Sequence, residues 1–236
     1  INGGGHRWSP LSPLNLQQAT DRGNKTTDTI ITTGVRTNNI IADTLNDSDF
    51  EIVVLPDLQY QTLTGTPPGP SADSSLVAYT FNWIIANKTT ANIKAVVQVG
   101  DLTDDGNSSQ FTRVAINYDK LDAYGIPYIY VPGNHDYAGG SPTDSRILTE
   151  YNNFMGPSRY TGMPYYGGNY LGSNANYYIK LDIGRRKFLI LGLEFEPRDA
   201  ALVWAQGIFD LNEDRETIVV THALVTQWGE KAQDTS

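Results

Sequence analysis

The fold is decided by residues 95–104, which read AVVQVGDLTD. A short valine-rich run that stops at Gly100-Asp101 is typical of a strand buried on both faces, as in a parallel sheet. Two similar runs flank it: 52–55, which stops at Pro56-Asp57, and 127–131, which stops at Pro132-Gly133. The stretch therefore predicts the middle strand of a parallel sheet.

Helical patterns over 76–86 and 111–121 separate the three runs, which gives the order β-α-β-α-β. The second half of the chain is mixed. It opens with a Gly/Tyr/Asn-rich stretch over 156–174 that we expect to be an irregular loop. Further elements are expected in this order: strands over 177–182 and 187–193, a helix over 200–211 and a strand over 217–220. The predicted class is α/β.

Composition excludes several classes of protein. The chain has 236 residues, 39% of them hydrophobic, so it can bury a full core. The absence of cysteine excludes disulfide scaffolds, thiol catalysis and cysteine-bound zinc. A net charge of −9 argues against a general nucleic-acid binder, which needs clustered Lys and Arg. No window approaches the roughly 18 uncharged apolar residues of a membrane-spanning helix, and no signal peptide is recognisable.

Residues 1–48 differ from the rest, because they are rich in Thr, Asn, Gly and Asp and lack a sustained period. Within them, 14–27 and the isoleucine pairs at 30–31 and 40–41 resemble segments of phage tail-fibre and related bacterial surface proteins. The alternative is a polar linker. We therefore expect an extension over 1–48, a folded domain over 49–236, neighbouring fibre or adhesin modules, and an extracellular or virion-associated location.

Polar side chains follow four of the predicted strands: Asp57-Leu58-Gln59, Gly100–Asp104, Gly133–Asp136 and Thr221-His222. In an open α/β sheet the carboxyl ends of the strands form one rim, where loops converge on a ligand. Carboxylate, amide and imidazole groups without thiolate suit Mn, Mg, Fe or Zn in a reactive site better than a structural zinc. The four clusters together predict a metal site.

Each cluster alone has a simpler explanation. Asp57 or Asp101 after a strand is an ordinary turn former or helix cap, and His222 at a strand end is an ordinary structural histidine. The Gly133–Asp136 run can be a tight turn. Four such clusters, each after a strand and in this order, favour the metal site.

In this order the clusters resemble the motifs of the calcineurin-like metallophosphoesterases. Gly100-Asp101-x-x-Asp104 and Gly133–Asp136 match two motifs fully, and His222 matches a third. The stretches 55–60, 193–199 and 204–205 resemble more narrowly a bacterial secreted branch with Asp-x-Gln as its first motif. The resemblance covers 50–236. It implies a two-sheet α/β sandwich that hydrolyses phosphate mono- or diesters with a metal-bound hydroxide at a dinuclear centre.

The resemblance also implies the ligands of two divalent ions, whose identity (Mn, Fe, Zn or Mg) stays open. Asp101 would bridge ions about 3.5 to 4 Å apart, a spacing that clamps both oxygens of an in-line phosphoryl displacement. Asp57 and Gln59 would serve one ion, and Asn134 and His222 the other.

Two catalytic residues follow from the same resemblance. His135 would stand over the phosphate as general acid or charge stabiliser, oriented by Asp104 through its other ring nitrogen. Asp136 and Asp105 are expected to cap and buttress the loops.

The sequence departs from the family pattern at two points. Gln59 replaces a histidine, and its amide oxygen favours Mn or Mg at that position. The chain has three histidines, His6, His135 and His222, so a final Gly-His-x-His motif is absent. We therefore expect a chain truncated at its C-terminus, without the last strands of the second sheet, that binds metal weakly and hydrolyses little.

Three alternatives stay open. A binding module of a phage tail or adhesin would use the same fold with slow turnover or none. Cleavage of nucleic acid would need a basic groove, and the only close basic cluster, 185–187, is expected in a solvated hairpin turn. Within 156–174, the tyrosines Tyr160, Tyr165, Tyr166 and Tyr170 can form a substrate wall or only an irregular connection.

Overall fold

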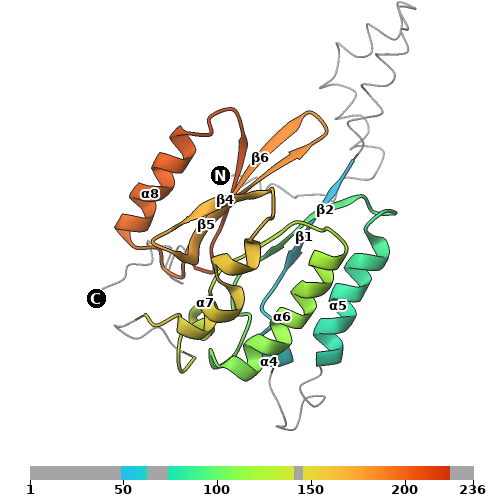
Figure 1. The fold of residues 1–236 in the computed structure, drawn as a ribbon, viewed down its shortest axis with the longest axis vertical. Coiled ribbons are helices and arrows are strands. Elements are labelled where there is room, and N and C mark those ends of the chain that lie inside the picture. Colours follow the sequence, from blue (N-terminus) through green and yellow to red (C-terminus); the bar gives the residue numbers. More distant parts are fainter. Residues whose placement is uncertain (1–48, 63–73, 141–145, 224–236) are drawn as a thin grey trace, which may run out of the picture. The chain divides into compact units, whose positions relative to one another are not determined.

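The computed structural model describes residues 49–62, 74–140 and 146–223, which form two β-sheets flanked by helices (Figure 1). The first sheet consists of three parallel strands: β1 (Glu51–Leu55), β2 (Ile93–Gln98) and β3 (Tyr128–Tyr130). The second sheet consists of four strands: β4 (Tyr166–Tyr170), β5 (Ser173–Ile183), β6 (Arg186–Gly192) and β7 (Glu216–Val220). Neighbours from β4 to β6 are antiparallel, whereas β7 is parallel to β6. The expected two-sheet α/β architecture is confirmed.

Helices cover the outer faces of both sheets. The long helices α5 (Ser74–Asn87) and α6 (Ser108–Ala123) lie beside the first sheet, and α8 (Asp199–Asp210) lies beside the second (Figure 1). Helix α6 begins where the Asn107 side chain accepts a hydrogen bond from the Gln110 N–H, an N-cap. Its buried side chains recur at helical spacing and include Phe111, Val114, Tyr118 and Leu121. The short elements are α4 (Gln59–Thr62), α7 (Thr149–Met155) and the 3-10 turns η1 (Asn134–Asp136) and η2 (Pro157–Tyr160).

The main core fills the space between the two sheets. Val96 and Ile129 of the first sheet belong to the same buried cluster as Ile179 and Ile190 of the second. A smaller cluster around Leu191 packs between the second sheet and α8. Most of β2 and β3 is thus covered on both faces, which explains their unbroken apolar character.

Buried tyrosines tie the sheets together through their hydroxyl groups. The Tyr177 hydroxyl accepts a hydrogen bond from the Tyr130 N–H at 2.8 Å and lies 2.8 Å from the Tyr160 hydroxyl. These three side chains, Tyr130, Tyr160 and Tyr177, are each at most 2% exposed. A hydroxyl group buried there without a hydrogen-bond partner would carry a desolvation cost. This network fixes β3, which leads into the Gly133–Asp136 turn, against the second sheet.

The structure corrects two expectations for the second half. The stretch 156–174 is not an irregular loop, because it contains η2 and β4, and β4 pairs with β5. Gly167 permits this pairing, since a Cβ there would lie 2.0 Å from the Tyr178 ring. Helix α7 was not predicted at all. Of the two alternatives for the tyrosines of 156–174, the substrate wall is wrong for Tyr160, which is 2% exposed and packs in the core.

The basic cluster at 185–187 lies in the β5–β6 hairpin as expected. Arg186 pairs with Glu216 and Lys187 with Asp214, with all four side chains well exposed. Within the described ranges, no helix is both long enough and apolar enough to cross a membrane. The predicted extension over 1–48 lies outside the described residues.

Candidate metal centre

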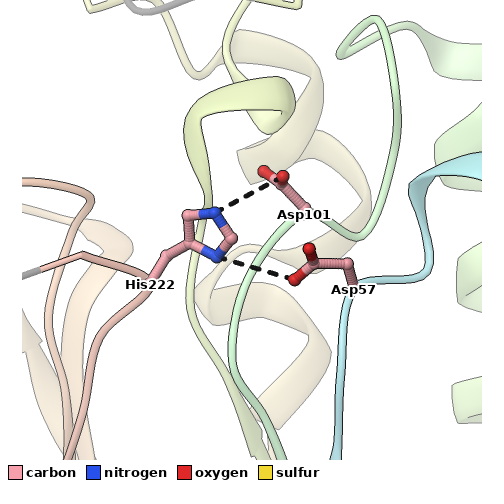
Figure 2. Close-up of side chains that lie close together, drawn as sticks. All are labelled: Asp57, Asp101 and His222. Carbon is pink, nitrogen blue, oxygen red and sulfur yellow. Dashed lines mark ion pairs between the residues drawn. The ribbon is translucent and has the colours of Figure 1, made fainter. Parts of the chain in front are cut away.

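Three side chains from the ends of three strands meet at one point (Figure 2). Asp57 follows β1, Asp101 follows β2 and His222 follows β7, and one ligand atom from each lies within 4.8 Å of the others. The His222 Nε2 atom is 3.4 Å from the Asp101 carboxylate, and Nδ1 is 3.8 Å from that of Asp57. Two carboxylates and an imidazole this close form a donor set that suits a divalent cation.

Asp101 is the centre of this cluster. It is 3% exposed, and burial raises the pKa of its carboxyl, opposed by the His135 N–H and by nearby His222. Its backbone lies in the left-handed region at φ 52°, which costs a non-glycine residue on the order of 1 kcal/mol. Hydrogen bonds hold it there, because the Leu58 N–H donates to its carbonyl and the His135 N–H to its carboxylate, both at 2.9 Å. Asp101 thereby joins the first, second and third motifs.

Two glycines make room for these side chains. A Cβ on Gly133 would lie 2.1 Å from the Asp101 Oδ1 atom, so only glycine lets the third motif approach the carboxylate. A Cβ on Gly100 would lie 2.6 Å from the His222 ring, and Gly100 also has φ +111°, a conformation that favours glycine. The glycine of each motif is thus a packing requirement of the cluster.

The tautomer of His222 follows from its contacts. Its Nδ1 atom lies 3.0 Å from the Val99 carbonyl, which can only accept, so Nδ1 carries the hydrogen. The Nε2 atom then faces Asp101, as in metal-binding histidines whose other nitrogen donates to a carbonyl. The ring also lies 5.9 Å from the ring of Phe195, centroid to centroid.

Asp136 connects the second and third motifs, as expected of a buttress. Its carboxylate, 1% exposed, accepts hydrogen bonds from the N–H groups of Leu102, Thr103 and Gly133 and from the Thr103 hydroxyl, at 2.9 to 3.1 Å. Burial raises the pKa of Asp136 to about 7, against the lowering effect of these donors. Thr103 was not singled out from the sequence, because a threonine in a loop carries no distinctive signal.

His135 and Asp104 lie together, with the closer contact through the backbone. The His135 Nδ1 atom is 2.8 Å from the Asp104 carbonyl and 3.5 Å from its carboxylate. Both residues are half-buried. Asp105 accepts a hydrogen bond from the Gln110 side chain at 2.9 Å, so it buttresses the loop before α6.

The remaining predicted ligands lie on the same loops. Gln59 begins α4, two residues after Asp57, and is 8% exposed. Its Oε1 atom is buried without a hydrogen-bond partner among the residues that the structure describes. Asn134 begins η1 directly before His135 and is half-buried. A buried amide oxygen without a donor carries a desolvation cost that a bound cation would remove.

The chain is similar to a known protein family and to a bacterial protein. The profile of the family described as calcineurin-like phosphoesterase matches residues 50–234. The uncharacterized protein YvnB of Bacillus subtilis (strain 168) is 27% identical over 151 residues, which is 64% of this chain and 11% of that protein. The chain thus spans about a tenth of that relative's length.

Two solved structures are similar to parts of the chain. A dimetal phosphatase from Danio rerio shares 14% identity at a TM-score of 0.46, covering 75% of this chain and 70% of that one. Purple acid phosphatase PPD1 from yellow lupin (Lupinus luteus) seeds shares 15% identity at a TM-score of 0.48, covering 80% and 34%. The family profile matches most of the chain, and its motifs meet at the rim described above. The chain belongs to the calcineurin-like phosphoesterase family.

Proposed function

We propose that the chain is a metal-dependent phosphoesterase whose centre is formed by Asp57, Asp101 and His222. The observation that carries the proposal is the convergence of their ligand atoms within 4.8 Å in a chain of this family. The coarse class, a phosphate-ester hydrolase with a divalent metal centre, is that of the family.

The residues fit a pair of divalent cations. Asp101 has one carboxylate oxygen near the His222 Nε2 atom, and Asp57, Asp101 and His222 would together hold the cations. Gln59 offers an oxygen without a partner, and Asn134 a second amide. Bound cations of this kind activate water and neutralise charge on the phosphoryl oxygens. An oxygen-rich donor set favours Mn or Mg.

His135 is the proposed general acid. Because its Nδ1–H donates to the Asp104 carbonyl, Nε2 is the atom that would give a proton to the leaving oxygen. The Asp104 carboxylate, 3.5 Å from Nδ1, would help to hold the ring in this orientation. Asp104 is thus a positioning residue, and Asp104→Asn should lower kcat while leaving KM nearly unchanged.

The test is hydrolysis of p-nitrophenyl phosphate and of bis(p-nitrophenyl) phosphate with and without Mn. We expect Mn-dependent turnover that falls on the order of 100-fold in Asp101→Asn and in Asn134→Ala. Asp214→Asn is the matched control, because that exposed carboxylate pairs with Lys187 away from the cluster and should leave turnover unchanged. Turnover that is independent of metal, or unchanged in Asp101→Asn, would refute the proposal.

A further inference from the structure

Gln98 is a buried amide at the end of β2, directly before the loop that carries Asp101. Its side chain is 0% exposed, whereas Lys94, the other polar residue of β2, is exposed. A glutamine inside a valine-rich strand loses its contacts with water, so its amide must find hydrogen-bond partners within the protein. The identity of these partners shows what the side chain does.

The Gln98 amide binds the main chain of two loops of the rim. Its Nε2 atom donates to the Pro56 carbonyl at 3.1 Å and to the Gly100 carbonyl at 2.7 Å. Its Oε1 atom accepts a hydrogen bond from the Gly100 N–H at 2.8 Å. The Pro56 carbonyl belongs to the peptide that leads into Asp57, and the Gly100 carbonyl to the peptide that leads into Asp101. One NH2 group thus holds the peptides directly before both carboxylates of the cluster.

This side chain joins the two loops beyond the end of the strands. The hydrogen bonds between β1 and β2 extend to the Val99 N–H, which donates to the Leu55 carbonyl at 3.2 Å. Farther along, the loops are joined by the Leu58 N–H, which donates to the Asp101 carbonyl, and by the Gln98 amide. A glutamine amide offers the same donor and acceptor groups as a peptide, so it can stand in for a main-chain link here.

The same amide holds a strained turn. Gly100 has φ +111° and Asp101 has φ 52°, so two successive residues have positive φ. A non-glycine residue keeps such a conformation only where its surroundings fix it. Gln98 binds both the N–H and the carbonyl of Gly100, and it thereby fixes the peptide planes on either side of this residue. The direction of the Asp101 side chain depends on these planes.

The third member of the cluster is reached through one peptide. The Gly100 N–H that donates to Gln98 belongs to the Val99–Gly100 peptide, and the carbonyl of that peptide accepts the hydrogen of the His222 Nδ1 atom at 3.0 Å. Because a peptide is planar, fixing its N–H also fixes the direction of its carbonyl. The main-chain partner of His222 is therefore held by the same amide as the peptides before Asp57 and Asp101.

We infer that Gln98 is a positioning residue, which sets the relative positions of Asp57, Asp101 and His222 and thereby the affinity of the site for metal. It acts through the main chain, since both groups of its amide bind backbone atoms. This inference rests on the proposed function, because it names the side chain that holds that site together.

The test measures Mn binding by calorimetry and urea unfolding in EDTA for Gln98→Met and Asn174→Leu. Methionine has about the length of glutamine and no amide. Asn174 is the matched control, because it is also 0% exposed and its amide binds the Met155 carbonyl and the Tyr166 hydroxyl. Both variants should unfold at a lower urea concentration than the wild type, but only Gln98→Met should bind Mn at least about 10-fold more weakly. Wild-type affinity in Gln98→Met, or equal weakening in both variants, would overturn the inference.

Two further measurements decide the matter if Gln98→Met does not fold. Gln98→Asn keeps the amide but is one CH2 shorter, so it should also bind Mn at least about 10-fold more weakly, and wild-type affinity would overturn the inference. In the metal-free wild type, NMR should show the Gln98 NH2 hydrogens exchanging with water at least about 10-fold more slowly than those of the exposed Gln206. Equally fast exchange would also overturn it. Slow exchange at Gln98 in a wild-type chain that binds no Mn would count against the proposed function alone.

Discussion

Gly133→Ala is expected to damage the metal centre by adding a single methyl group. The new Cβ would lie 2.1 Å from the Asp101 Oδ1 atom, whereas an ordinary contact is at least 3.4 Å, so atoms must shift by about 3.4 − 2.1 = 1.3 Å. Overpacking of this kind costs about 1–3 kcal/mol. The displaced carboxylate would also lose the His135 N–H, a further 1–2 kcal/mol or so. We therefore expect a loss of about 2–5 kcal/mol in the free energy of unfolding.

Gly207→Ala is the matched control. Gly207 lies inside α8, and a Cβ there would meet nothing within 4 Å, so alanine should stabilise the chain by about 0.5–1 kcal/mol. Urea unfolding of both variants, with Mn binding by calorimetry, tests the pair. If Gly133→Ala unfolds at the wild-type urea concentration and binds Mn as tightly, the steric argument about Asp101 is wrong.

Three further predictions concern single side chains. Burial raises the pKa of Asp136 from 3.8 to about 7, so the metal-free native chain holds this proton more tightly than the unfolded chain. The free energy of unfolding should therefore fall by up to about 4 kcal/mol as the pH rises from about 4 to about 7. Urea unfolding in EDTA from pH 4 to 8 should show this slope, and Asp136→Asn should flatten it; an equal slope in both would count against it. His222→Ala should weaken Mn binding at least about 10-fold, whereas His135→Ala should keep the affinity for Mn and lose turnover. If calorimetry and kinetics show the opposite pattern, His135 is the metal ligand and His222 the catalytic residue. Arg159→Ala should cost about 2–4 kcal/mol in urea unfolding, because its guanidinium, 9% exposed, binds the half-buried Asp122; a loss below about 1 kcal/mol would contradict this.

The sequence predicted the first sheet well, because strand identity there is a local property. β2 and β3 lie within one or two residues of their expected positions, and the polar clusters follow the strands as foreseen. Helix α7 and strand β4 were missed because their stability is not local. β4 contains two glycines, and it forms through its pairing with β5 and the packing of Gly167 on Tyr178.

The candidate site was predictable in its residue types but not in its connections. The order of motifs placed Asp57, Asp101 and His222 on one rim, where the structure brings them together. The contacts that fix them are largely main-chain ones, such as the Leu58 N–H with the Asp101 carbonyl, and a backbone group leaves no trace in the sequence. The acidic and basic residues of 193–199 were visible as a motif, but the contact of Glu194 with Arg146, a distant residue in sequence, was not. The extracellular or virion-associated location and the fibre-like extension stay predictions.

The central claim is that Asp101 and His222 share a divalent cation. Anomalous diffraction from crystals soaked in Mn tests it directly. We predict a peak about 2.0–2.3 Å from both the Asp101 carboxylate and the His222 Nε2 atom. Peaks only at exposed carboxylates such as Asp182 and Asp214, with none between Asp101 and His222, would contradict the claim.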